Sequence, residues 1–471
     1  MKTHGKKKKF ILRFSILIFL IFFWFSFPRP LFNDPYSTLL LDRNLELLGA
    51  KLAGDEQWRF PESEKVPEKF KKAILSFEDQ YFYYHPGINP VSTCRALYQY
   101  ISEGRIISGG STLTMQVIRL SRKNKSRNIF EKMIEMFYAF RMECSYSKSE
   151  ILALYASHAP FGGNVVGLDA ASWRYFGVDA GKLSWAQAVT LAVLPNSPAL
   201  IYPGKNHEKL LAKRNKLLVK LYKEGEFDQA TLSLALSEPL PEKPYPLPQI
   251  APHLLVRAVQ EGNKGIKITS TVYLQLQENV NKIIELHEKI LEANEIHNAA
   301  ALVLDVNTGS VLAYTGNTGS DEKKEYSNDV DIILSPRSTG SILKPYLYAA
   351  MLNDGLLLPT TLVPDIPMQL GGFIPENYNR TYDGAVPAKR ALARSLNIPA
   401  VKMLQSYDYN KFYSLLKKLG ITTLTKPADH YGLSLILGGA EASLWDLAGI
   451  YASMARTLNH FNLYGKYNKD D

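Results

Sequence analysis

A proline-dense segment divides this chain into two regions that differ in their residue patterns. Residues 239–248 read Pro-Leu-Pro-Glu-Lys-Pro-Tyr-Pro-Leu-Pro, which favours an extended linker because each proline removes a backbone donor and fixes φ. Before that segment, from residue 67 to about residue 203, apolar residues recur at helical spacing. After it, apolar runs at 299–306 and 311–314 flank the turn sequence Asn-Thr-Gly-Ser, which predicts a β-hairpin. The 471 residues suffice for two or three domains, so we expect a mostly helical domain followed by a mixed α/β domain.

Local signals locate individual elements in the first region. Pro67 and the apolar spacing after it predict the start of a helix. Ser147 and Glu150 form a capping-box pattern at the start of a second helix. A third helix is predicted over 183–194, where a proline ends it. Upstream, the short apolar stretch at 38–42 indicates a strand pair.

The N-terminus combines a lysine cluster with an apolar run. Residues 6–9 are all lysine, and residues 10–27 carry Arg13 as their only charge. At about 1.5 Å per residue this run nearly spans a hydrocarbon core of about 30 Å. The run ends in Phe-Ser-Phe-Pro-Arg-Pro, without the small residues that a signal peptidase needs. We therefore expect an uncleaved membrane anchor with the lysines in the cytoplasm and the remainder outside; a cleaved signal peptide is the alternative.

Charge and cysteine content narrow the class of partner. The net charge of +10 indicates an acidic partner, either anionic lipid or a phosphorylated substrate. Nucleic acid is the competing interpretation, but no zinc-finger spacing or basic-aromatic repeat supports it. Two cysteines, Cys94 and Cys144, are too few for a disulfide framework and are expected to be buried small hydrophobes. No His-Glu-x-x-His or Cys/His cluster indicates a metal site.

One carboxylate followed by a glycine-rich turn indicates a site for proton removal and anion binding. Glu78 ends an apolar run, and its aromatic neighbours favour a raised pKa. The turn beginning at Gly109 carries hydroxyl and amide groups suited to a phosphate. Glu78 is therefore the candidate general base.

A second charged group follows on a predicted helix. Lys132 and Glu135 lie three positions apart, which places both on one helical face. A simple ion pair within the helix is the alternative to a functional role. Arg127, a few residues upstream, would add a further cation.

These stretches together carry a family resemblance. Residues 78–87, Glu-Asp-Gln-Tyr-Phe-Tyr-Tyr-His-Pro-Gly, and residues 109–116, Gly-Gly-Ser-Thr-Leu-Thr-Met-Gln, resemble the first two motifs of the peptidoglycan glycosyltransferases of family 51. That domain forms the N-terminal half of class A penicillin-binding proteins. Residues 109–116 and the Ala-Pro-Phe-Gly-Gly at 159–163 are similar to the 1C branch of that class. The resemblance covers roughly residues 60–456.

The resemblance implies both an activity and a set of partners. It implies a mostly α, lysozyme-like fold that polymerises lipid II into glycan strands, with Glu78 as base and Lys132 and Glu135 against the pyrophosphate. The substrate-binding residues that it implies are His85, Ser111, Thr112, Gln116, Arg127 and Lys132. Lipid II, the growing glycan strand, the cytoplasmic (inner) membrane and other cell-wall synthesis proteins are the implied partners. No cofactor is certain, and a divalent cation at the pyrophosphate stays open.

The chain departs from the family pattern at several positions. The differing residues are Met115, Glu131, Ser157 and Gln187, where glutamine, a basic residue, asparagine and glutamate are usual. None of these changes removes Glu78 or Glu135.

The region after the linker carries a second set of motifs. Ser341 and Lys344 lie one helical turn apart, as in the acylation motif of penicillin-binding transpeptidases, and Ser395 with Asn397 resembles the second motif. No Lys-Thr-Gly or Lys-Ser-Gly follows Asn397 within the 471 residues. In the family, that motif lies on a strand that forms a wall of the site. We therefore expect an incomplete α/β domain, β-lactamase/transpeptidase-like, with doubtful transpeptidase activity.

Taken together, these patterns predict six segments. They are a basic tail at 1–9, an anchor at 10–27, a connector at 28–60, a glycosyltransferase domain at 61–238, a linker at 239–265 and a C-terminally truncated transpeptidase-like domain at 266–471. Two other interpretations stay open at this point. One is a non-catalytic membrane-anchored scaffold that binds lipid II or partner enzymes. The other is a glycan hydrolase, against which Lys132 and Arg127 argue.

Overall fold

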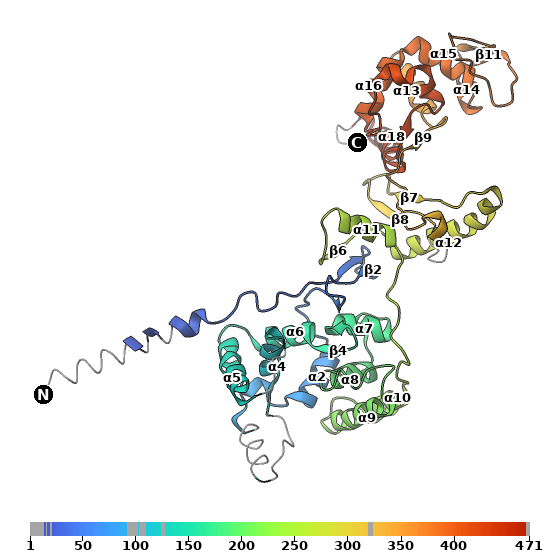
Figure 1. The fold of residues 1–471 in the computed structure, drawn as a ribbon. Coiled ribbons are helices and arrows are strands. Elements are labelled where there is room, and N and C mark those ends of the chain that lie inside the picture. The colour runs from blue at the N-terminus through green and yellow to red at the C-terminus, as the bar shows by residue number, and fades with distance from the viewer. Residues whose placement is uncertain are drawn as a thin grey trace. The chain divides into compact units, whose positions relative to one another are not determined.

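The computed structural model describes residues 14–15, 17–18, 21–91, 102, 110–123, 128–318 and 324–467, and it divides into two compact units (Figure 1). The first unit comprises residues 1–41, 47–249 and 258–269, and the second comprises residues 42–46, 250–257 and 270–471. The first is mostly helical and the second combines helices with short strand pairs. This order confirms the expected architecture of a helical domain followed by an α/β domain.

Helices make up most of the first unit. They are α2 (Glu68–Glu78), η1 (Phe82–Tyr84), α4 (Leu113–Ser121), α5 (Ile129–Glu143), α6 (Lys148–His158), α7 (Leu168–Phe176), η2 (Ala180–Lys182), α8 (Trp185–Val193), α9 (His207–Lys223) and α10 (Gln229–Ser237). α2 packs against α8 in a core where Phe70, Ile74 and Val189 are fully buried. Because α2 ends at Glu78, this packing fixes the position of the Glu78 side chain at the edge of the core.

Two small sheets complete the first unit. β1 (Thr38–Leu41) pairs antiparallel with β2 (Leu47–Lys51) and parallel with β6 (Lys267–Thr269). β5 (Val165–Val166) lies between β3 (Trp58–Arg59) and β4 (Pro160–Gly162). The strand pair predicted at 38–42 is thus confirmed.

The predicted helix starts are also confirmed. Ser147 and Glu150 form a reciprocal capping box at the start of α6, and Ser184 and Gln187 form another at the start of α8. The Gln187 amide oxygen accepts from the Ser184 backbone N–H at 3.0 Å. A glutamate would offer the same acceptor, so this departure from the family preserves the cap.

The N-terminal segment contacts α5 through a buried arginine and through aromatic rings. Arg141 donates to the backbone oxygens of Phe23 and Trp24, each at 2.8 Å, and its guanidinium lies over both rings. Part of the predicted anchor, residues 10–13, 16 and 19–20, lies outside the described residues. Among the residues that are described, no helix has the length and apolar character needed to cross a membrane.

The second unit surrounds a separate core. Its elements include α11 (Pro252–Gln260, which extends into the first unit), α12 (Leu274–Leu291), η3 (Glu292–Asn294), η4 (Lys324–Tyr326), α13 (Lys344–Asn353), α14 (Ala388–Ala393), α15 (Asn397–Tyr407), α16 (Tyr409–Leu419), α17 (Ala428–Tyr431), η5 (Gly432–Leu437) and α18 (Leu444–Tyr464). Leu347, Leu404 and Phe412 are fully buried where α13, α15 and α16 pack.

Short antiparallel pairs accompany these helices. The hairpin predicted near residue 307 is confirmed as β7 (Ala301–Leu304) with β8 (Val311–Thr315). β10 (Leu362–Asp365) pairs with β11 (Gly384–Pro387), and β9 (Arg337–Ser338) pairs with β12 (Glu441–Ala442). Helix α11 begins within the range that the sequence predicted as a linker.

Candidate functional site

Glu78, the candidate base, stands at the end of α2 among polar groups from other elements. The Gln116 side chain on α4 donates from Nε2 to Glu78 Oε2 at 2.8 Å. Asn196, which follows α8, has its Nδ2 at 3.5 Å from Glu78 Oε1, the outer limit of a hydrogen bond. Two amide groups therefore hold the carboxylate, one on each oxygen.

The surroundings of Glu78 change its proton affinity. Burial raises the pKa of Glu78 above the ordinary glutamate value. The hydrogen bonds from Gln116 and Asn196 and the charge of Lys213 oppose this shift, while the charge of Asp79 adds to it. The pKa of Glu78 remains raised, which suits a carboxylate that must accept a proton near neutral pH.

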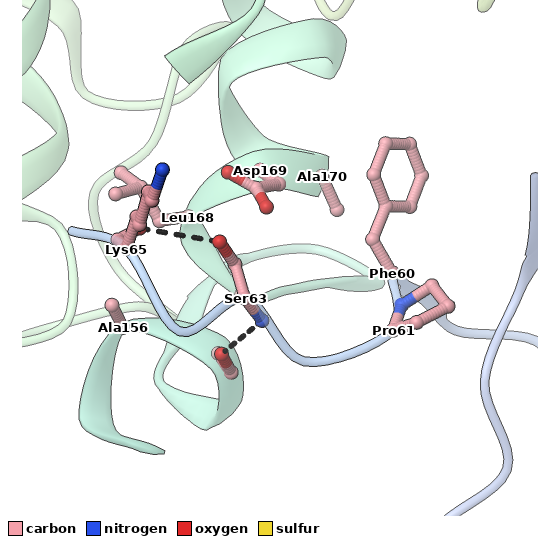
Figure 2. Close-up of a pocket in the computed structure, with 10 residues that line it drawn as sticks. Phe60, Pro61, Ser63, Lys65, Ala156, Leu168, Asp169 and Ala170 are labelled. Carbon is pink, nitrogen blue, oxygen red and sulfur yellow. Dashed lines mark hydrogen bonds between the residues drawn. The ribbon is translucent and has the colours of Figure 1, made fainter. Parts of the chain in front are cut away.

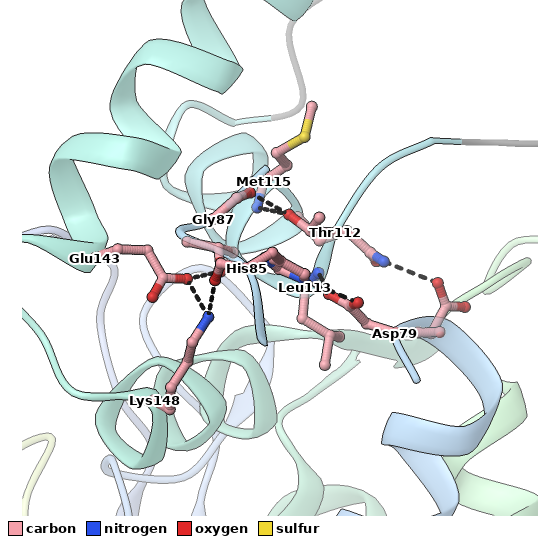
Figure 3. A network of polar contacts seen from close by, with 11 residues as sticks. Asp79, His85, Gly87, Thr112, Leu113, Met115, Glu143 and Lys148 are labelled. Carbon is pink, nitrogen blue, oxygen red and sulfur yellow. Dashed lines mark hydrogen bonds and ion pairs between the residues drawn. The ribbon is translucent and has the colours of Figure 1, made fainter. Parts of the chain in front are cut away.

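The next residue, Asp79, ties the end of α2 to the start of α4 (Figure 3). Its carboxylate accepts from the Leu113 backbone N–H at 3.0 Å. The His85 ring bonds the same carboxylate through Nε2, at 3.0 and 3.1 Å from the two oxygens. His85 is buried, so this predicted substrate-binding residue is engaged within the fold.

Thr112 is likewise engaged within the fold (Figure 3). It is the N-cap of α4: its hydroxyl oxygen accepts from the Met115 backbone N–H at 3.1 Å and donates to the Gly87 carbonyl at 2.6 Å. The side chain is buried. Thr112 thus sets the direction of α4, and with it the position of Gln116.

A lysine–glutamate ion pair also contacts the segment that contains His85. Lys148 Nζ donates to Glu143 Oε1 at 2.8 Å and to the His85 carbonyl at 2.7 Å (Figure 3). Its ammonium also lies 4.5 Å from the centre of the Phe82 ring. The Thr114 hydroxyl donates to Glu143 Oε1 at 2.6 Å. The pair joins α4, α5 and α6 to the loop that follows Glu78.

Glu135, the second predicted carboxylate, pairs with an arginine that the sequence analysis missed. Arg119 donates from Nε and Nη2 to the two oxygens of Glu135, at 2.8 and 2.7 Å. Its Nη2 also donates to Ser111 Oγ at 3.2 Å. The signal was available, because Arg119 follows Gln116 by three residues and so shares its helical face.

Lys132 is not the partner of Glu135. Within the described part of the chain, Lys132 makes no ion pair, and its side chain is half-buried. The simple helix ion pair considered from the sequence is therefore wrong. Arg127 lies outside the described residues.

Helix α4 brings the two candidate carboxylates to one place. Gln116 contacts Glu78 and Arg119 contacts Glu135. Residues three apart on a helix are neighbours, with Cβ atoms about 5–6 Å apart. One face of α4 thus carries both the amide that contacts Glu78 and the guanidinium that contacts Glu135.

The second unit holds a separate polar site. Lys344 is buried, and its Nζ donates to the Ser395 carbonyl and to Asn397 Oδ1, each at 2.8 Å, with Ser395 Oγ at 3.3 Å. Burial lowers the pKa of Lys344 to about 8. Ser341 is exposed, three residues before Lys344. The four predicted residues of this domain therefore belong to two neighbouring segments.

A buried amide that the sequence analysis missed supports the second segment. Asn377 Oδ1 accepts from the backbone N–H groups of Asn397 and Ile398 at 2.9 and 3.2 Å. Its Nδ2 donates to Asp365 Oδ1 at 2.7 Å. Asn377 lies twenty residues before Asn397, outside any helix or strand, so no local pattern identifies it.

The first unit also holds a small pocket (Figure 2). Its lining includes Phe60, Ser63 and Lys65, together with Ser157 on α6 and Asp169 on α7. The Ser63 backbone N–H donates to Ser157 Oγ at 3.4 Å. Burial and the charge of Asp179 raise the pKa of Asp169 to about 6. None of the predicted site residues lines this pocket.

No metal centre is found in the part of the chain that the structure describes. Groups of three or more His, Cys, Asp or Glu side chains placed to hold an ion do not occur there. Cys144 is a free, exposed cysteine, so its expected burial is wrong. Cys94 lies outside the described residues.

Comparisons with known proteins match both units. The Transglycosylase family matches residues 46–222, and the penicillin binding protein transpeptidase domain matches residues 299–458. Penicillin-binding protein 1C of Escherichia coli is 36% identical over 403 residues, which cover 85% of this chain and 52% of that protein. Penicillin-binding protein 1A/1B of Bacillus subtilis is 26% identical over 467 residues, which cover 94% and 49%. The chain spans about half the length of these curated relatives.

A solved structure also matches. It is the crystal structure of penicillin-binding protein 1A from Haemophilus influenzae, with a TM-score of 0.45 and 18% identity, covering 89% of this chain and 68% of that one.

Proposed function

We propose that this chain, which belongs to the class A penicillin-binding proteins, polymerises lipid II into glycan strands through its first unit. The observation that carries the proposal is the pairing on α4. Gln116 holds a half-buried carboxylate with a raised pKa, and Arg119 holds Glu135 one turn further on. Each part of this arrangement has a counterpart in the reaction.

The reaction joins an acceptor hydroxyl to the anomeric carbon of a donor sugar. Glu78 takes the proton of the acceptor hydroxyl as its oxygen forms the new bond to that carbon. The bond from the anomeric carbon to the lipid diphosphate breaks, and the diphosphate leaves with the bonding electrons. Negative charge grows on the diphosphate, where a fixed cation stabilises it.

The cations near α4 are suited to that leaving group. Arg119 is held by Glu135 and Ser111, so its guanidinium is preorganised. Lys132 has no protein counter-ion among the described residues and is available to a diphosphate. Arg127 is proposed as a further cation for the diphosphate on the basis of the sequence alone. His85 and Thr112 act in it by positioning α4, since His85 Nε2 bonds Asp79 and the Thr112 hydroxyl bonds Gly87 and Met115.

The N-terminal segment is proposed as a single membrane anchor. The lysine cluster and the apolar residues 10–27 motivate this proposal. Phe22, Trp24 and Phe25 are exposed, and Arg141 holds the segment to α5. The anchor would place the glycosyl-transfer site at the outer face of the cytoplasmic membrane, where its lipid-linked substrate lies.

The second unit is proposed as a transpeptidase-like site that residues 1–471 do not complete. Ser341, Lys344, Ser395 and Asn397 are present, but no Lys-Thr-Gly follows Asn397 in these residues. In the family, the strand with that motif supplies part of the oxyanion hole, and acylation needs those donors. We infer that the polypeptide of residues 1–471 by itself acylates Ser341 slowly or not at all.

The glycosyltransferase proposal is tested by polymerisation. The 471-residue polypeptide in detergent should convert lipid II to strands that a muramidase digests, with release of the lipid diphosphate. Binding of lipid II without any polymer or released diphosphate would support the scaffold instead. Cleavage of preformed strands without polymerisation would support the hydrolase.

A further inference from the structure

Two polar residues that the sequence analysis did not assign form a chain leading to Glu78. Lys213, on α9, donates from Nζ to Asn196 Oδ1 at 3.0 Å. Asn196 Nδ2 lies 3.5 Å from Glu78 Oε1. Helix α9 packs against α2 and α8. Glu78 ends α2 and Asn196 follows α8, so the three residues meet where three helices converge.

The chemistry of the three groups determines how the amide is oriented. An ammonium group only donates hydrogen bonds, an ionised carboxylate only accepts them, and an amide has one donating and one accepting end. With Lys213 bound to Oδ1, the N–H groups of Asn196 face Glu78. The Ser197 hydroxyl, 3.4 Å from Oδ1, adds a second donor at that end. The reverse orientation would set the amide oxygen against the carboxylate and the amide N–H groups against the ammonium.

We propose that Lys213 is a positioning residue for Glu78. Lys213 acts through Asn196: it holds the amide N–H groups of Asn196 toward the Glu78 carboxylate. This inference rests on the proposed function, in which Glu78 removes a proton from the acceptor hydroxyl. The hydrogen bond from Asn196 to Glu78 is longer than the one from Gln116 to Glu78. Long hydrogen bonds of catalytic groups in a substrate-free site often tighten when substrate binds. Lys213 thus keeps the second oxygen of Glu78 provided with a donor.

The other groups that face Glu78 show what Lys213 adds. Asp79, the residue that follows α2, raises the pKa of Glu78, and the Gln116 amide on α4 lowers it. Tyr155, on α6, is fully buried, and its own pKa is raised well above the usual value, so the phenol is neutral. Lys213 brings a positive charge that favours the ionised base. Its loss should therefore raise the pKa of Glu78 further, and the base should become protonated at a higher pH.

The test compares Lys213→Met with Lys213→Arg and Lys216→Met. Lys216 lies three residues further along α9 and is exposed, so Lys216→Met changes the net charge equally without touching Asn196. kcat/KM for polymerisation of lipid II is measured from about pH 5 to about pH 9. Lys213→Met should lose activity several-fold at the acidic end and little at the alkaline end. Lys213→Arg and Lys216→Met should follow the wild-type profile.

A second variant tests the route through Asn196. Asn196→Ala should move the acidic limb in the same direction as Lys213→Met. The double variant should lose much less than the product of the two single losses, because both changes remove one coupled unit. Multiplicative losses, or an equal drop in kcat/KM at every pH, would show that Lys213 contacts substrate or only stabilises the fold, and would overturn the inference.

The outcome also separates this inference from the proposed function. If the wild type polymerises lipid II, Glu78→Gln does not, and folded Lys213→Met keeps the wild-type acidic limb, then only the role of Lys213 is wrong. If the wild type fails to polymerise, or Glu78→Gln is fully active, the proposed function itself is wrong.

Discussion

In the first unit Glu78 meets two amide donors from α4 and from the segment after α8, whereas in the second unit Lys344 meets oxygen atoms of residues 395–397. Burial moves both groups toward the neutral form: it raises the pKa of Glu78 and lowers the pKa of Lys344 to about 8. Hydrogen bonds and Lys213 oppose this shift at Glu78, while burial is the cause that acts on Lys344.

This difference has a consequence for the chemistry of each site. A carboxylate is a base when it is ionised, so the donors around Glu78 favour the form that the proposed reaction needs. An amine is a base when it is neutral, so in the proposed transpeptidase-like site the burial of Lys344 would prepare it to take a proton from Ser341. The residues of the first site come from α2, α4, α5, α6 and α9. Those of the second site come from two segments, 341–344 and 395–397.

The largest expected contrast is in covalent labelling. The polypeptide of residues 1–471 should polymerise lipid II yet show little or no labelling by a fluorescent penicillin, because no Lys-Thr-Gly follows Asn397 in these residues and the proposed site draws part of its oxyanion hole from that motif. Gel fluorescence against a penicillin-binding standard measures this. Stoichiometric labelling that disappears in Ser341→Ala would mean that the second site is complete enough to acylate.

Arg119→Ala should lower the kcat/KM of polymerisation by about 10²–10³-fold, since one fixed donor to a developing oxyanion has about that effect. Lys132→Ala should weaken binding of the diphosphate-bearing substrate with a smaller effect on turnover. Neither change should alter the low penicillin labelling expected of the second site. If both variants polymerise at the wild-type rate, the leaving group is stabilised elsewhere.

Lys148→Met should lower the free energy of unfolding of the first unit by about 1–3 kcal/mol, because Glu143 then lacks a charged partner in a largely buried position. The control is Lys71→Met, which removes an exposed ion pair with Glu68 and should cost about 0–1 kcal/mol. Chemical denaturation measures both. Equal effects would show that the network of Figure 3 does not stabilise the loop after Glu78.

The smallest effect concerns Lys344 and pH. Its pKa in the folded protein is about 8, below its usual value in the unfolded chain, so above about pH 8 the folded protein binds fewer protons than the unfolded chain. Stability should therefore rise with pH from about 8 toward the unfolded pKa. The thermal midpoint of the wild type should increase relative to that of Lys344→Met over this interval. A constant difference would mean that Lys344 titrates normally.

Much of both sites could be predicted from the sequence because their motifs are local. Glu78 and Gln116 do meet, and Lys344 does contact Ser395 and Asn397. The supporting residues were harder to find, because Asn196 lies 118 residues after Glu78 and Asn377 lies in an irregular segment. Sequence spacing also assigned Lys132 as the alternative partner of Glu135, whereas tertiary packing supplies Arg119 from a different helix.

Polymerisation by Glu78→Gln tests the central claim most directly, since glutamine keeps the shape of the side chain and removes its basicity. The matched control is Glu208→Gln on α9, an exposed position. We expect Glu78→Gln to bind lipid II as the wild type does and to polymerise it about 10²–10⁴-fold more slowly, while Glu208→Gln is unaffected. A folded Glu78→Gln protein that forms glycan strands at the wild-type rate would contradict the assignment of Glu78 as the base.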